Sequence, residues 1–144
     1  MFFGRYFHQI DQKGRMRLPS KLRQEMGDKI HVIQGSSAGC LFIFSDEEFN
    51  AFTEKLVAVS IFDETKQKPV RQILTSGVVI EEDNQGRFLL PPYLRQFAEL
   101  KKDIVFMGVG KRVELWSQER WDAYNNVSEE EYAESMAVLA ELGL

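Results

Sequence analysis

One internal repeat limits the fold more than any other feature of this sequence. The 14 residues from Asp11 to Gln24 align with the 14 residues from Asp83 to Gln96, at an offset of 72 positions. Eight of the 14 aligned positions are identical, among them the Asp, the Gly, the first Arg and the Leu-Pro pair. Because 72 is half of the 144 residues, we expect two copies of one unit, spanning 1–72 and 73–144.

Both units are expected to contain the same elements. An extended segment leads into Asp-x-x-Gly-Arg, which predicts a tight hairpin turn followed by a second strand. The glycines (Gly14 and Gly86) supply the turn position with φ > 0, and the aspartates (Asp11 and Asp83) accept hydrogen bonds from turn N–H groups. A Pro then ends the strand and begins a short helix. Apolar strands follow at 30–33, 41–44, 104–107 and 113–116, with turns at 35–39 and 108–110, so the repeat cores span about 5–47 and 76–119.

Helices are predicted from their capping residues. Ser45, Ser117 and Ser128 stand where a side chain can accept a hydrogen bond from the first helical turn. A linking helix should end near Leu74, and the last helix should be amphipathic. A unit this small cannot bury enough apolar surface alone, so we expect the two units to pack as a pseudo-twofold pair. The predicted fold is a β-dominated α+β fold in which repeated strands share one barrel-like sheet, with helices at its periphery.

The charge of the chain is distributed unevenly. The net charge is −4, but residues 1–72 carry +2 and residues 73–144 carry −6. Within residues 1–23, six Lys or Arg side chains stand against one Asp. Such a segment is either a solvated face or a polyanion-binding patch on an acidic body.

Three of these cations form the best candidate site. Lys13, Arg15 and Arg17 alternate along the predicted hairpin and would share one face of it. A two-stranded ribbon fits the major groove of DNA, where Arg binds guanine bidentately, so we predict DNA contact. The alternative for Arg15 is a salt bridge to Asp11. Further DNA-contact candidates are Arg5, Lys21, Arg23 and Arg87, of which Lys21 and Arg23 are equally well explained as solvated helix residues and Arg87 as a partner of Asp83.

Enzymatic function is not expected from this sequence. His8, His31 and Cys40 have no metal-ligand spacing, so we predict neither a metal nor a cofactor. Phosphate-binding-loop and nucleophile-elbow motifs are missing, and no small-molecule substrate is expected. With one cysteine, no signal peptide and no apolar run of about 18 residues, the chain is expected to be cytoplasmic without a membrane partner.

The duplicated Asp-x-x-Gly-Arg…Leu-Pro-x-x-Leu-Arg pattern resembles the AbrB/MazE-type swapped-hairpin domain, a DNA-binding module. Two copies, with Phe-Phe-Gly near the start and Glu-Leu-Trp at 114–116, resemble the MraZ family from residue 2 to about residue 125. That resemblance implies a double-split β-barrel, a ring of subunits, and a nucleoid-associated transcriptional regulator. It further implies binding to short direct repeats in the promoter of its own cell-division and cell-wall operon, usually as a repressor.

Two alternatives stay open at the level of sequence. The same barrel could serve an antitoxin-like protein-interaction module, although such proteins usually carry one unit and a disordered tail. The two copies also differ, because Lys13 and Arg17 correspond to Gln85 and Leu89. The first copy is therefore expected to make most of the phosphate contacts. The operator sequence, the sign of regulation and the number of subunits do not follow from the sequence.

Overall fold

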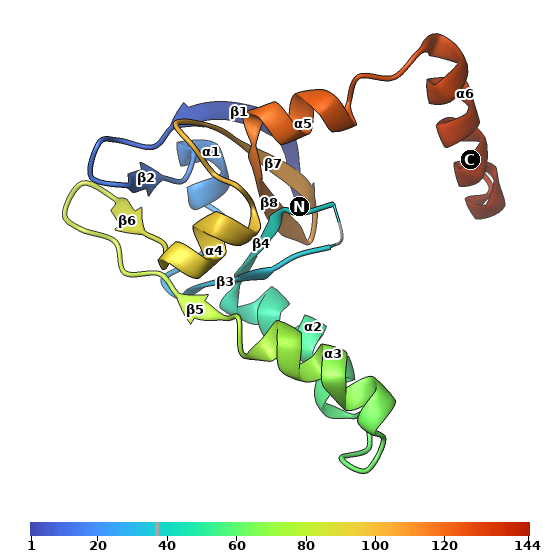
Figure 1. Ribbon diagram of the computed structural model, residues 1–144, viewed down its shortest axis with the longest axis horizontal. Coiled ribbons are helices and arrows are strands. Elements are labelled where there is room, and N and C mark those ends of the chain that lie inside the picture. The colour runs from blue at the N-terminus through green and yellow to red at the C-terminus, as the bar shows by residue number, and fades with distance from the viewer. Residues whose placement is uncertain (37) are drawn as a thin grey trace.

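A six-stranded antiparallel sheet forms the body of the protein in the computed structural model, which describes residues 1–36 and 38–144 (Figure 1). Its strands lie in the order β1-β7-β8-β4-β3-β5. Their bounds are β1 Phe2–Gln9, β3 Ile30–Gln34, β4 Leu41–Ser45, β5 Val78–Val79, β7 Asp103–Gly110 and β8 Arg112–Ser117. The four predicted apolar strands are thus confirmed, while Ser37, in the predicted 35–39 turn, lies outside the described residues.

The strand order follows the sequence repeat. Strands β4 and β8 are corresponding elements of the two units and pair with each other at the centre of the sheet. Phe42 lies opposite Glu114, its equivalent 72 positions later. The flanking pairs are Leu41–Leu115 and Ile43–Val113, and a shift of 72 positions converts each of these pairs into the other. Outward from this centre, β3 corresponds to β7 and β5 to β1. The two halves are therefore related by an approximate twofold axis, as the repeat predicts.

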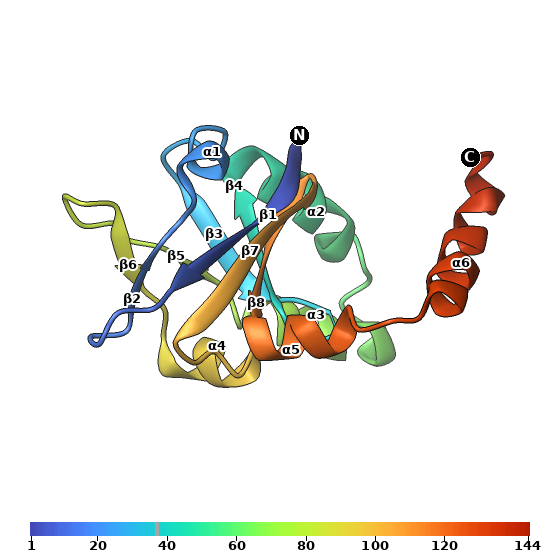
Figure 2. The ribbon, with the colours of Figure 1, turned by 90° about the horizontal axis from the view of Figure 1, so that it is seen from above.

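The strands that follow the two Asp-x-x-Gly turns form a separate ribbon. Strands β2 (Arg15–Arg17) and β6 (Arg87–Leu89) pair antiparallel with each other, with Met16 opposite Phe88. The sequence pattern suggested a hairpin within each unit. Instead, each turn is closed locally, and the strand beyond it pairs with the equivalent strand of the other unit. Figures 1 and 2 show both turns projecting on one side of the molecule.

Corresponding apolar residues of the two units meet in one core. Met16 and Phe88 are 2% and 1% exposed, so the inner face of the ribbon is fully buried. Behind them pack the leucines of the two Leu-Pro-x-x-Leu segments, Leu18, Leu22, Leu90 and Leu94. Burial of the ribbon therefore depends on both repeats, and neither unit completes this core alone.

Short helices connect and flank the strands. They are α1 Ser20–Arg23, α2 Asp46–Val57, α3 Glu64–Leu74, α4 Pro92–Phe97, α5 Gln118–Tyr124 and α6 Glu129–Val138, with a 3-10 turn at Leu139–Leu142. The predicted caps are confirmed, because Ser45, Ser117 and Ser128 accept hydrogen bonds from the N–H groups of Glu48, Arg120 and Glu131. Helix α3 ends at Leu74, as expected. Helix α6 stands apart from the sheet in both views (Figures 1 and 2).

The architecture is therefore mixed α+β and largely antiparallel. The larger sheet has β1 and β5 as its outer strands, and the ribbon is a separate two-stranded sheet. Closure of these strands into a double-split barrel stays a prediction. No helix in the described ranges is both long and apolar enough to cross a membrane.

Candidate nucleic-acid interface

The two Asp-x-x-Gly turns have the same internal geometry. In the first turn, Oδ1 of Asp11 accepts hydrogen bonds from the N–H groups of Lys13 (2.9 Å) and Arg15 (2.8 Å). Asp83 binds the N–H groups of Gln85 and Arg87 in the same way, both at 2.9 Å. The turn glycines have φ values of +83° and +75°, in the left-handed region that favours glycine. Each aspartate therefore holds the turn from which its arginine projects.

Each aspartate also fixes the orientation of that arginine. The Arg15 Nε donates to Asp11 Oδ2, and the Arg87 Nε donates to Asp83 Oδ2, both at 2.8 Å. Both pairs are partly exposed, with 26% of each arginine side chain and 37% of each aspartate accessible. These bonds use the Nε atoms and leave the terminal Nη groups as donors. The salt bridge and the DNA contact were alternatives for Arg15 in sequence, but this geometry is compatible with both.

The pKa values of the two aspartates follow from these contacts. Hydrogen bonds from the backbone N–H of Arg15, and then from its side chain, lower the pKa of Asp11. The pKa of Asp83 is lowered by the corresponding bond from the backbone of Arg87. Both carboxylates are thus ionised at neutral pH and keep their arginines in place.

The outward face of the ribbon collects arginines from both repeats. Met16 points into the core, so Arg15 and Arg17 share the opposite face, where they lie across from Leu89 and Arg87. Arg17 is exposed and donates from Nη2 to the Gln85 Oε1 at 3.2 Å. In the described part of the chain, Arg17 has no acidic partner within 4.0 Å. Three guanidinium groups thus lie on one short ribbon.

The other predicted contact residues are dispersed. Lys13 is exposed at the tip of the first turn, and Lys21 is exposed on α1. Arg5 lies on β1, with its guanidinium carbon 5.4 Å from the centre of the Trp121 ring. Arg23 is bound to Glu82, with an Nη2–Oε1 distance of 2.8 Å. The charge of Arg23 is therefore already compensated within the protein.

The histidines and the cysteine take part in packing contacts. His31 is hydrogen-bonded to Asp46 at 2.8 Å and stacks on Phe49, with the ring centres 4.0 Å apart. Burial raises the pKa of the Cys40 thiol. Among residues 1–36 and 38–144, no three His, Cys, Asp or Glu side chains are grouped so that they could hold a metal ion.

Sequence reasoning missed two features of this region. One is the partner of Arg17, because Gln85 is 68 positions away and reaches it only through β2–β6 pairing. The other is Arg95, whose Nη1 would lie 3.0 Å from a Cβ added at Gly14. The repeat alignment contained a usable signal for Arg95, since it corresponds to Arg23.

Fold and site together define a class: a two-repeat α+β protein with a pseudo-twofold axis that presents an arginine-bearing β-ribbon. The chain matches a family model described as "MraZ protein, putative antitoxin-like" over residues 1–72 and 73–140. It is 41% identical to a protein of Carboxydothermus hydrogenoformans named Transcriptional regulator MraZ, over 93% of each chain. Proteins of the same name from Halothermothrix orenii and Heliobacterium modesticaldum are 38% and 40% identical over the full length of both chains. The chain therefore belongs to the MraZ family.

Proposed function

We propose that this chain is a sequence-specific DNA-binding transcriptional regulator that uses the β2–β6 ribbon and its two turns to contact DNA. The observation that carries the proposal is the outward face of the ribbon, where Arg15, Arg17 and Arg87 lie together. Antiparallel ribbons fit the major groove, and bidentate arginine is the commonest means of binding guanine. The names of the relatives support a role in transcription.

The Asp–Arg salt bridges give the ribbon its specificity in this proposal. An arginine held at Nε by a carboxylate is already oriented, so less side-chain entropy is lost when its Nη groups bind a base edge. Arg17 and Lys13 are exposed and are suited to phosphate contacts. Phosphate contacts position the protein on DNA, while base contacts give sequence specificity.

The proposal includes an assembly and a target. The working species is a ring homo-oligomer. In each subunit, the two repeats, 1–72 and 73–144, close into a double-split barrel. The ring binds short direct repeats in the promoter of its own cell-division and cell-wall operon and acts there as a cytoplasmic, nucleoid-associated repressor without catalytic activity. One ribbon offers few contacts, and several ribbons held in a fixed array raise the effective concentration of each further contact.

Binding to the chain's own promoter tests the proposal directly. Fluorescence anisotropy with DNA upstream of its own gene, at moderate salt, should give binding at least tenfold tighter than to a scrambled duplex of the same length. Equal binding to both duplexes would contradict a sequence-specific regulator. A binding assay without a scrambled control would not separate specificity from general attraction to phosphates.

An antitoxin-like protein-interaction module is the second candidate. The description of the family favours it, and helix α6, with Tyr132 and Met136 exposed, would supply the surface that binds the partner. In that case, removing α6 should abolish partner binding and leave promoter binding intact. If the intact chain does not bind promoter DNA but captures a protein partner through the ribbon, the module is favoured over the regulator.

A further inference from the structure

The approximate twofold symmetry breaks at one charged position. Arg23 and Arg95 are equivalent, 72 positions apart. The Nε of Arg23 donates to both carboxylate oxygens of Glu82, at 3.0 and 3.1 Å, and its Nη1 donates to the Gly27 carbonyl oxygen. The residue 72 positions before Glu82 is Ile10, which has no carboxylate to offer Arg95. Arg23 in the first repeat is therefore neutralised by a carboxylate, whereas its equivalent in the second repeat, Arg95, has no carboxylate at the corresponding position.

The structure gives Arg95 no substitute for that acid. Its Nε atom is buried and has no hydrogen-bond partner among the described residues. No carboxylate of residues 1–36 or 38–144 lies within 4.0 Å of its guanidinium group. Glu99, just beyond the C-terminal end of α4, is bound to Arg120 at 3.2 Å. A half-buried guanidinium group without a counter-ion favours binding an anion.

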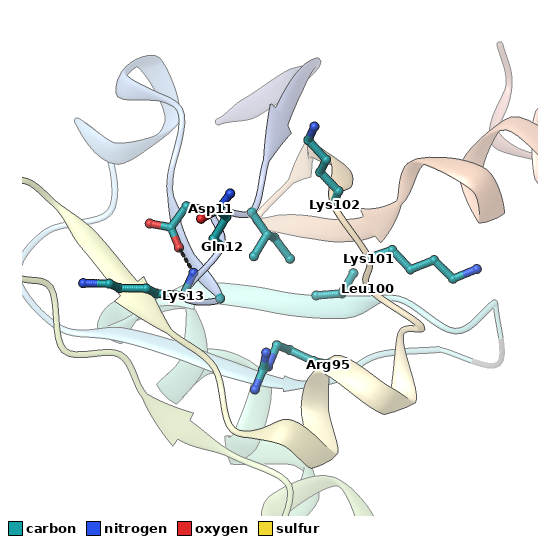
Figure 3. A pocket seen from close by; sticks show the side chains of 9 residues that line it. Asp11, Gln12, Lys13, Arg95, Leu100, Lys101 and Lys102 are labelled. Atoms are coloured by element: carbon teal, nitrogen blue, oxygen red, sulfur yellow. Dashed lines mark hydrogen bonds between the residues drawn. The ribbon is translucent and has the colours of Figure 1, made fainter.

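A hollow adjoins this guanidinium group. Its volume is about 600 Å³, and it lies between the first turn and the segment that joins α4 to β7. Figure 3 shows Arg95 reaching from α4 toward the turn, while Lys13, Lys101 and Lys102 stand at the rim with their ammonium groups extended outward. Lys101 binds Glu119 at the surface, but Lys13 and Lys102 have no acidic partner in the described ranges.

Gly14 provides the room for the guanidinium group. A Cβ at Gly14 would meet the Arg95 Nη1 at 3.0 Å, a distance tighter than most real contacts. At the equivalent Gly86, the nearest atom is instead a carboxylate oxygen of Glu82, at 3.8 Å. The two turns thus differ in what lies against their glycines: a free cation at the first and a neutralised ion pair at the second.

We infer that the hollow between residues 10–14 and 95–102 is a phosphoryl-binding site, with Arg95 as its central donor and Lys13 and Lys102 as mobile cations at its rim. A guanidinium group binds two phosphate oxygens at once, and lysine adds charge without a fixed geometry. The phosphoryl group comes either from the DNA backbone beside the first turn or from a free phosphorylated small molecule. The first source rests on the proposed function, and the second does not.

Inorganic phosphate is the probe for the site itself. Isothermal titration calorimetry and ³¹P line broadening, with chloride at matched ionic strength as reference, should show saturable binding to the intact chain. Arg95→Gln should weaken this binding at least tenfold, whereas Lys68→Gln, an equal charge change on α3, should leave it unchanged. Ile10→Glu supplies the missing carboxylate and should also prevent phosphate binding. Retained binding in both Arg95→Gln and Ile10→Glu, with folding verified by circular dichroism, would overturn the site.

The salt dependence of DNA binding distinguishes the two sources. If a backbone phosphate occupies the site, Arg95→Gln should reduce the slope of log affinity against log salt by about 0.9. If the source is a free small molecule, DNA binding should be unchanged while phosphate binding is lost. If the wild-type chain binds no promoter DNA, the proposed function fails, and the phosphate titration alone decides the site.

Discussion

Arg17 and Arg87 lie directly opposite each other in the β2–β6 ribbon, one from each repeat. Like charges in directly opposite positions of an antiparallel pair disfavour the folded state. Arg87 is partly neutralised by Asp83, whereas the partner of Arg17 among residues 1–36 and 38–144 is the neutral amide of Gln85. The ribbon therefore keeps a repulsive pair at one of its ends, and an anion bound to this face would relieve that repulsion.

Replacing Arg17 tests whether that anion is DNA. Arg17→Gln should weaken promoter binding and lower the slope of log affinity against log salt by about 0.9, because one phosphate contact is lost. The free energy of unfolding should change by no more than about 0.5 kcal/mol, since the side chain is exposed. Anisotropy at several salt concentrations and urea titration measure the two quantities. The control is Lys68→Gln, and an unchanged slope in Arg17→Gln would exclude Arg17 from the interface.

The two salt-bridged arginines should contribute equally. The sequence suggested that the second copy contributes less, because Gln85 and Leu89 replace two cations. The Asp–Arg geometry is nevertheless the same in both turns, at 2.8 Å and equal exposure. We therefore expect Arg15→Ala and Arg87→Ala each to cost about 1–3 kcal/mol of specific binding. Competition anisotropy against scrambled DNA measures this loss, and a folded Arg15→Ala protein with full affinity would contradict it.

The lowered pKa values predict how stability responds to acid. For Asp11, bonds from Arg15 hold the folded-state pKa below the usual value of about 3.9. Its charge therefore stabilises the fold above pH 4, and this stabilisation is lost as the pH falls through the lower, folded-state pKa. Asp83 behaves in the same way.

The matched comparison is the wild-type chain against Asp11→Asn/Asp83→Asn, since Asn keeps an acceptor oxygen without the charge. The difference in free energy of unfolding should be largest near pH 5–7 and should close below about pH 4. Urea unfolding at each pH measures it. A difference that stays constant from pH 7 to pH 3 would show that the charges of the aspartates do not stabilise the turns.

Much of the local structure could be predicted from the sequence, and the long-range pairing could not. The turn chemistry at Gly14 and Gly86 and the serine caps are encoded within a few neighbouring residues, so they were predicted correctly. The pairing of β2 with β6 joins segments about 70 positions apart. Nothing in either segment alone distinguishes pairing within a unit from pairing between units.

In the candidate site, too, the sequence predicted individual residues but not the pairings between distant segments. Arg15, Arg17 and Arg87 were identified from spacing, and the structure places all three on the ribbon. The pairing of Arg23 with Glu82 depends on how the two repeats pack, because 59 positions separate them. The repeat alignment places Ile10 at the position equivalent to Glu82. That this difference leaves Arg95 without an acidic partner among the described residues follows only once the Arg23–Glu82 pair is known.

The buried face of the ribbon gives a stability prediction. Phe88 is 1% exposed and pairs with Met16 near the pseudo-twofold axis. Phe88→Ala should reduce the free energy of unfolding by about 3–5 kcal/mol, because it leaves a cavity between the repeats. Phe88→Leu keeps most of the volume and should cost less. Urea titrations measure both, and a loss below about 1 kcal/mol in Phe88→Ala would mean that the ribbon is not part of the shared core.

Assembly through helix α6 is the last prediction. The helix stands off the sheet, and Tyr132 and Met136 are 58% and 42% exposed. Apolar side chains on a detached helix are expected to be covered by another subunit in the proposed ring. Light scattering should give a mass several times 16.7 kDa for the wild-type chain and a lower mass for Tyr132→Ser/Met136→Ser.

DNA length provides the functional readout of the same assembly. A duplex with three repeats should bind the wild-type chain far more tightly than a duplex with one repeat, because linked ribbons raise the effective concentration of later contacts. The α6 variant should lose that difference and keep its affinity for a single repeat, since α6 lies on the opposite side of the molecule from the two turns (Figure 2). A wild-type chain that is monomeric at working concentration, or that binds one repeat as tightly as three, would rule out the ring.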